Sequence, residues 1–293
     1  YYDKMRGMEN HVDLHVHSTA SDGTVRPAEV VQLAKARGLT TIALTDHDTT
    51  DGLAEAIEAG RAIGLEVIAG LEINSEDDQI DAHFLAYGLD RSNAPLQDQL
   101  LAIRDARIGR AKGMLKKLAA LGMPVEWGRV LKYAGEAQSI ARPHIARAMI
   151  EAGFVASTQE AFDKYISDDG PAYVHRLKLT PQEVIDLVHG AGGAIVLAHP
   201  VQAHTTPLVP QFVELGLDGV EVYYSDHTEV MRAELLALAQ QYDLIVTGGS
   251  DFHSPGDKSH AELGSIFVPD EVMPRLKAGI KRRQRIAFGT TNQ

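Results

Sequence analysis

The sequence contains no cysteine in its 293 residues. That absence excludes disulfide bonds, zinc sites built from thiolates and a thiol nucleophile. Any bound metal ion must therefore be held by imidazole and carboxylate groups, which favours manganese, with iron and zinc as the alternatives. The 13 histidines and 40 acidic residues provide an ample supply of such ligands.

The sequence also lacks a long apolar run and an excess of positive charge. No stretch approaches the roughly 20 apolar residues of a membrane span, and we find no secretory leader, so we expect a soluble, cytoplasmic protein without a membrane partner. The net charge of −12 argues against a groove that binds long duplex nucleic acid. Small phosphorylated substrates or short oligonucleotides stay possible if metals and a few arginines supply positive charge locally.

Short apolar runs alternate with amphipathic helical stretches over most of the chain. This alternation is typical of β/α units around a parallel sheet or barrel. A helix is expected from Ala28 to Arg37, because Pro27 suits a first helical turn and Gly38 a helix end. We expect strands at Val12–His17, Thr41–Leu44, Glu66–Ala69, Ala82–Tyr87, Ala194–Ala198, Gly219–Tyr223 and Leu244–Thr247.

The pattern changes between residues 94 and 174, where helical stretches follow one another without a convincing strand. Leu96–Leu121 carries apolar residues at three-and-four spacing, and Ser157 with Glu160 forms a capping-box pattern. The β/α pattern resumes at a second capping box, Thr180–Glu183. The sequence therefore predicts a discontinuous barrel domain, residues 11–93 and 175–293, and a helical insertion, residues 94–174.

Metal-ligating side chains gather around the expected strands. His15 and His17 are two residues apart on a strand, so both point to one face and can grip one ion. Asp251 and His253 repeat that spacing after another apolar run. Further competent residues at or near strand ends are Asp22, His47, Glu72, His83 and His199. A shared metal cluster at the carboxyl rim of a barrel requires this distribution, whereas unrelated structural histidines do not.

The motifs HxH, TDH, GxE, a lone His, HP and SDFH occur here in an order that resembles the polymerase and histidinol phosphatase (PHP) family of phosphoesterases. The resemblance extends from His11 to about Pro269. It implies a distorted (β/α)7-type barrel, a hydrolase acting on phosphate esters, and two or three divalent metal ions. The helical insertion with an Arg-x-His pair is similar to the stand-alone branch, which includes 3′,5′-nucleotide bisphosphate phosphatases and exonucleases of the ribonuclease AM type.

The resemblance also implies roles for individual residues. Its metal ligands would be His15, His17, Glu72 and Asp251 for the first ion, Glu72, His83 and His199 for the second, and Asp22, His47 and His253 for the third. Two ions that share a carboxylate lower the pKa of a water and present hydroxide to phosphorus. Glu72 and Asp251 would thus be catalytic through the metals they hold.

Three further residues are expected to act on the substrate. Arg142 can offer a bidentate fork to a phosphate, with His144 beside it, so that the insertion caps the site. The alternative for Arg142 is a solvated arginine at a helix start. His227 follows another expected strand and is a candidate acid for the leaving oxygen, with a position behind the site as an equal alternative.

Three functions agree with these features. The first is a monoesterase that removes the 3′-phosphate of 3′,5′-nucleotide bisphosphates by metal-activated hydroxide. The second is a 5′-to-3′ exonuclease of short RNA, because the acidic charge disfavours long substrates only. The third is a histidinol-phosphatase-like enzyme or a regulatory metal-binding module. The sequence does not decide the oligomeric state, and a monomer agrees with it.

Overall fold

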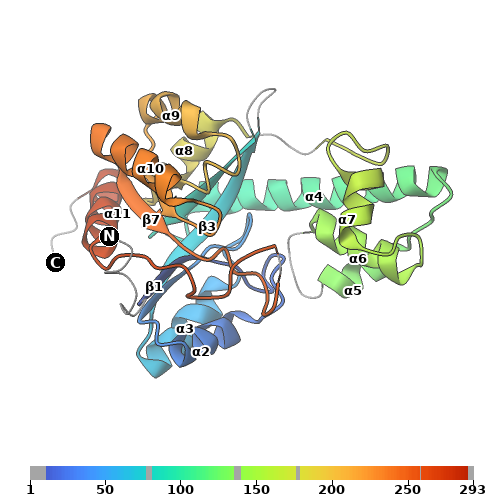
Figure 1. Ribbon diagram of the computed structural model, residues 1–293, viewed down its shortest axis with the longest axis horizontal. Helices are drawn as coiled ribbons and strands as arrows, with labels where there is room; N and C mark the ends of the chain where they lie inside the picture. The colour runs from blue at the N-terminus through green and yellow to red at the C-terminus, as the bar shows by residue number, and fades with distance from the viewer. Residues whose placement is uncertain (1–10, 77–80, 135–139, 176–178, 258, 290–293) are drawn as a thin grey trace.

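The computed structural model describes residues 11–76, 81–134, 140–175, 179–257 and 259–289. Within them, seven strands form one sheet whose spatial order follows the chain (Figure 1). The strands are β1 (Val12–Val16), β2 (Thr41–Leu44), β3 (Glu66–Glu76), β4 (Asp81–Tyr87), β5 (Ala194–Leu197), β6 (Gly219–Tyr223) and β7 (Ile245–Gly248).

The two outer strands of the sheet meet at the rim and close it into a distorted barrel. Val16 forms a bridge with Phe252, and the N–H of His17 donates to the carbonyl of Phe252 at 2.9 Å. Just before it, the N–H of Asp251 donates to the carbonyl of His15, also at 2.9 Å. This closure places the segment after β7 directly beside the end of β1.

The expected barrel is confirmed, with a difference at β4, which runs antiparallel to both neighbours. Glu76 and Asp81 are too close in sequence for the crossover of a dozen or more residues that a parallel pair needs. Strand β3 also continues to Glu76 instead of ending at Ala69. Because of this extension, Glu72 lies within a strand and pairs with Leu85 of β4.

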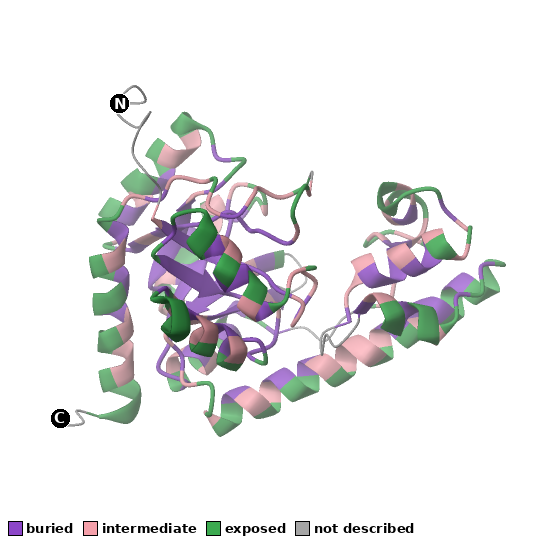
Figure 2. Ribbon diagram, turned by 90° about the horizontal axis from the view of Figure 1, so that it is seen from below, coloured by how far each residue is buried: buried purple, intermediate pink, exposed green. Residues whose placement is uncertain are grey.

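Helices cover the outside of the barrel, and the strands inside it are almost wholly buried (Figure 2). The first helix confirms its expected position, since Pro27 begins it and Gly38 follows it with a positive φ of 84°. The covering helices are α2 (Pro27–Ala36), α3 (Leu53–Ile63), α8 (Pro181–Gly190), α9 (Val209–Leu215), α10 (Glu229–Gln241) and α11 (Val272–Phe288), with a short 3-10 helix at Thr206–Leu208.

A group of helices projects to one side of the barrel between β4 and α8 (Figure 1). It consists of α4 (Ala94–Ala120), α5 (Trp127–Ala134), α6 (Arg142–Glu151), α7 (Thr158–Ala161) and a π-helical turn, Phe162–Ile166. We call it the helical segment. Helix α4 joins two cores: Leu96 and Leu100 pack with the barrel, whereas Met114 and Leu118 pack with α5 and α6. The described residues of the helical segment include no strand.

Among the described residues, none of the helices combines the length and the apolar character that crossing a membrane would require.

Candidate metal centre

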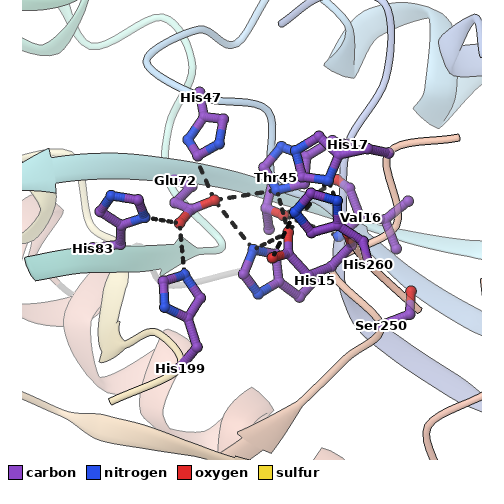
Figure 3. A network of polar contacts seen from close by, with 12 residues as sticks. His15, Val16, His17, Thr45, His47, Glu72, His83, His199, Ser250 and His260 are labelled. Atoms are coloured by element: carbon purple, nitrogen blue, oxygen red, sulfur yellow. Dashed lines mark hydrogen bonds and ion pairs between the residues drawn. The ribbon is translucent and has the colours of Figure 1, made fainter. Parts of the chain in front are cut away.

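The barrel rim brings together all nine residues that the sequence analysis nominated as metal ligands. Strand β1 and its end position His15 and His17, β3 positions Glu72, and β4 positions His83 (Figure 3). The loops after β1, β2, β5 and β7 position the others, which are Asp22, His47, His199, Asp251 and His253. Groups of these side chains have ligand atoms within 4.8 Å of one another, as one ion requires.

Glu72 stands at the centre of the cluster, and its Oε2 faces three imidazoles. This oxygen lies 3.1 Å from Nε2 of His15, 3.1 Å from Nε2 of His17 and 3.3 Å from Nδ1 of His47. The carboxylate of Asp251 completes the group, because its Oδ1 lies 3.2 Å from Nε2 of His15 and 3.1 Å from Nε2 of His17. Two carboxylates and two histidines thus surround one point.

The second oxygen of Glu72 faces a different pair of imidazoles. Its Oε1 lies 2.8 Å from Nδ1 of His83 and 3.3 Å from Nε2 of His199. The two sides of one carboxylate therefore belong to two adjacent ligand groups. In Figure 3, Glu72 lies between His83 and His199 on one side and the β1 histidines on the other.

A third group lies beside the first and includes the predicted trio of Asp22, His47 and His253. His253 Nε2 lies 3.3 Å from Oδ1 of Asp22, and His47 Nε2 lies 4.0 Å from Oδ2 of Asp22. His17 also falls within this group. Its ring stacks on that of His253 at 4.1 Å between centroids, so His17 connects the first and third groups.

The chemistry of these side chains fits cations. His15 and His17 are fully buried, and Glu72 is 1% exposed. Yet Nε2 of His17, Oδ1 of Asp22 and Nδ1 of His47 are buried without a hydrogen-bond partner of suitable geometry. Buried lone pairs left unsatisfied are costly, and a coordinated ion would satisfy them.

The charges within the cluster keep its carboxylates ionised, whereas for His15, His17, His199 and His253 the nearby carboxylates outweigh burial and raise the pKa. Burial raises the pKa of Glu72, but the neighbouring His47 and His15 outweigh it and hold that pKa well below its usual value. The pKa of Asp251 is likewise low, because His15 and His17 outweigh its burial. Burial lowers the pKa of His47 to about 4. Ionised carboxylates and a neutral imidazole are the protonation states in which these groups bind metals.

A further carboxylate, which the sequence analysis did not nominate, holds two of these ligands in place. Glu221 on β6 is fully buried, and its Oε1 lies 3.1 Å from Nδ1 of His15. Its Oε2 accepts a hydrogen bond from the N–H of His199 at 2.8 Å. Such a contact fixes the ring so that the opposite nitrogen faces the metal. A lone acid between the apolar residues Val220 and Val222 was the available sequence signal.

The loop after β7 is held by a second buried carboxylate. Asp13 accepts hydrogen bonds from the N–H of Ser250 at 2.9 Å, its hydroxyl at 2.6 Å, and the N–H of Gly264 at 2.7 Å. The hydroxyl of Tyr224 donates to Oδ2 of Asp251 at 2.9 Å. Asp251 itself adopts a positive φ of 54°, which costs energy outside glycine and persists where the surroundings determine it.

A cavity of about 640 Å³ opens over the cluster. The barrel contributes most of its lining, including Glu72, His83 and Asp251. The helical segment contributes Pro143, Arg147 and Thr158. His260, to which we assigned no role from sequence, also lines it and stacks on His253 at 4.2 Å. The candidate centre therefore has one wall of potential ligands and another of helices.

The three residues expected to act on the substrate lie in different places. Arg142 does not line the cavity, because its Nη1 donates to Oδ1 of Asp168 at 2.6 Å and its guanidinium lies over Phe162. His144 is buried and lines a neighbouring cavity, and burial lowers its pKa to about 4, although the charge of Asp22 favours protonation. His227 is buried outside the lining, with Nδ1 2.9 Å from the carbonyl of Val222.

A distorted barrel with a carboxylate-bridged histidine cluster at its rim defines a metal-dependent hydrolase. The PHP domain profile matches residues 13–139. The chain is 32% identical to a 3′,5′-nucleoside bisphosphate phosphatase of Chromobacterium violaceum over 281 residues, covering 92% of this chain and 98% of that one. It is 33% identical to a 5′-3′ exoribonuclease of Haemophilus influenzae, covering 91% of this chain and 98% of that one.

Comparison with solved structures points to the same family. A crystal structure of a proposed metal-dependent phosphoesterase from Bifidobacterium adolescentis superimposes with a TM-score of 0.84 and is 34% identical, covering 92% of this chain and 96% of that one. The chain therefore belongs to the PHP family of phosphoesterases. It is a hydrolase that acts on phosphate esters, as the motifs predicted.

Proposed function

We propose that this enzyme removes the 3′-phosphate from 3′,5′-nucleotide bisphosphates. The observation that carries the proposal is the single cavity that has the Glu72-centred cluster on one wall and the helical segment on the other. A small substrate with two phosphates could then contact both walls. The similarity to a bisphosphate phosphatase over nearly the whole chain supports this choice.

The proposed metal sites use the nine ligands in the groups implied by the sequence: His15, His17, Glu72 and Asp251, then Glu72, His83 and His199, then Asp22, His47 and His253. Manganese is the proposed metal, with iron or zinc as alternatives, since all ligands are imidazoles or carboxylates. Metal ions bound here would supply Lewis acidity and a nucleophile at neutral pH. Glu72 would help to hold two of the ions, because its two oxygens face different ligand groups.

The residues around the ligands would preserve this geometry during the reaction. Glu221 would keep His15 and the backbone at His199 in orientation, and Tyr224 would do so for Asp251. His227 stays only a candidate acid for the leaving oxygen, because its ring lies outside the cavity lining. Protonation of the leaving group from solvent requires no such residue.

We further propose that residues 94–174 cap a barrel domain made of residues 11–93 and 175–293. The separate hydrophobic core of the helical segment supports this division, and Pro143, Arg147 and Thr158 are the residues that reach the cavity. His144 lines a second cavity next to the first, and the charge of Asp22 reaches it, so it would contact a phosphate bound there. A role of Arg142 as a phosphate ligand would first require its contact with Asp168 to break.

An exonuclease of short RNA is the second candidate. A neighbouring cavity of about 480 Å³ shares Thr24 and Arg147 with the first and offers room for a second nucleotide. The similarity to a 5′-3′ exoribonuclease supports it as well. We place the enzyme in the cytoplasm, where either substrate would be found.

One experiment separates the candidates: incubation with adenosine 3′,5′-bisphosphate, adenosine monophosphates, histidinol phosphate and 5′-phosphorylated short RNA in Mn²⁺. Release of inorganic phosphate from the bisphosphate, at the highest kcat/KM of the panel, is the expected result. Stepwise release of mononucleotides from RNA at a higher efficiency would support the exonuclease instead. Preference for histidinol phosphate would refute both.

A further inference from the structure

The lining of the cavity over the cluster is rich in carboxylates. It includes the carboxylates of Asp22, Glu72, Asp81, Asp251 and Asp257. Among the lining residues that the structure describes, Arg147 is the only arginine, and none is a lysine. A substrate with more than one phosphate therefore finds a single permanent positive side chain besides any metals that the cluster holds.

The geometry of helix α6 determines which arginine reaches the cavity. Residues three or four apart share a helix face, so Arg147 lies on the same side as His144 and Pro143. Arg142 precedes Arg147 by five residues, about 140° around the helix axis. It therefore points elsewhere and is occupied by Asp168 and the carbonyl of Ile166. Pro143 and Arg147 line the cavity, whereas Arg142 does not.

The side chain of Arg147 is also available to bind a ligand and lines two cavities. We find no hydrogen bond or ion pair of its side chain within the described part of the chain, although the side chain is half-buried. It lines both the cavity over the cluster and the neighbouring cavity, which also includes His144. The N–H of Ala141 donates to Nδ1 of His144, so the proton of that neutral ring is on Nε2. The charged guanidinium of Arg147 and the neutral N–H donor of His144 therefore line the same neighbouring cavity.

We propose that Arg147, and not Arg142, binds the non-reacting phosphate of the substrate and so selects nucleotides that carry two phosphates. This inference rests on the proposed function and names its specificity residue. A guanidinium presents two parallel N–H groups to phosphate oxygens, which a lysine cannot reproduce. Holding the second phosphate orients the first over the cluster, so the contact raises kcat/KM for such substrates.

The test compares Arg147→Met with Arg142→Met, a matched loss of an arginine from the same helix. For Arg147→Met we expect kcat/KM for adenosine 3′,5′-bisphosphate to fall about 10- to 100-fold, the range for a lost charged contact. With p-nitrophenyl phosphate, which has no second phosphate, the change should be about twofold or less. Arg142→Met should keep the preference of the wild type, and Arg147→Lys should restore it only in part.

A dinucleotide substrate distinguishes the two candidate substrate classes, a nucleotide bisphosphate and a short RNA. If the exonuclease reading holds, Arg147→Met should reduce the cleavage of a 5′-phosphorylated dinucleotide more than that of the bisphosphate. Equal losses on the bisphosphate and on p-nitrophenyl phosphate would overturn the inference, and so would unchanged kinetics. Metal content and melting temperature, measured for every variant, identify a loss that comes from misfolding.

Binding gives a readout that does not depend on turnover. Calorimetric titration with adenosine 3′,5′-bisphosphate can use the Glu72→Gln protein, with and without Arg147→Met. Weaker binding by the double variant supports the inference even if the wild type fails to hydrolyse this nucleotide, in which case only the proposed function falls. Equal binding by the two proteins overturns the role of Arg147 and leaves the proposed function standing.

Discussion

The barrel rim and the helical segment contribute to the same cavity in different ways. At the rim, strands and loops position the backbone of the potential ligands. Two buried carboxylates, Asp13 and Glu221, also hold His15, His199 and the loop that carries Asp251. The helical segment has a core of its own and reaches the cavity through a few side chains of α6 and α7. The comparison supports our proposal that the barrel rim carries the chemistry and the helical segment the choice of substrate.

One contact joins the two regions next to the cluster. Arg107 of α4 pairs with Asp48, which directly follows His47. The N–H of Asp48 donates to the carbonyl of Glu72 at 2.9 Å, so this contact touches two of the candidate ligand positions. The position of the helical segment is thereby tied to the rim.

The largest effect should come from the centre of the rim. Glu72→Gln removes the charge that faces two ligand groups, so we expect kcat to fall by about a thousandfold or more. Steady-state kinetics on the preferred nucleotide measure this, with metal content determined in parallel.

Glu66→Gln is the matched control for that variant. Glu66 lies on the same strand but is half-exposed and pairs with Lys277 on the surface. It should retain the kinetics of the wild type. Near-normal turnover of Glu72→Gln with its metals still bound would refute the bridging role.

An intermediate effect on metal binding is expected when a residue that orients a ligand, Glu221, is changed. Glu221→Gln keeps the size of the side chain but removes the charge that faces His15. We expect the apparent metal affinity to fall about 10- to 100-fold, as for other residues that orient metal ligands. Titration of the metal-stripped protein with Mn²⁺, followed by activity and by calorimetry, measures it. Unchanged affinity would mean that the strand ends alone fix the ligands.

The smallest effect is expected in the helical segment. Asp168 is 62% exposed, so losing its pair with Arg142 should lower the free energy of unfolding by about 1 kcal/mol or less. Metal content and kcat/KM should not change in Arg142→Met. The role expected from the sequence, a direct grip on a phosphate, requires instead a loss of roughly 2 to 4 kcal/mol confined to bisphosphates. Denaturant unfolding and substrate kinetics decide between them.

The sequence was informative about the rim because local periodicity determines what lies there. Two-residue spacing placed His15 and His17 on one face, and the apolar runs before His47 and His199 marked strand ends. The antiparallel β4 was harder to predict, because it depends on pairing between strands and not on the run itself. The position of Glu72 within a strand followed from the same pairing.

Sequence patterns did not predict the contacts between segments that are far apart in the chain. Glu221 serves the cluster only because β6 lies next to β5, which precedes His199. The occupation of Arg142 by Asp168 depends on how α6 packs on the π-helical turn. Arg147 was nevertheless within reach, because its three-residue spacing from His144 predicts a shared face once α6 is accepted as a helix.

The central claim is that the rim holds a cluster of more than one metal ion, and elemental analysis of protein purified without chelator tests it most directly. The account predicts more than one equivalent of transition metal per chain, activity that a chelator abolishes, and recovery on adding Mn²⁺. A stray, sub-stoichiometric ion in a protein that hydrolyses phosphate esters at an undiminished rate would contradict it.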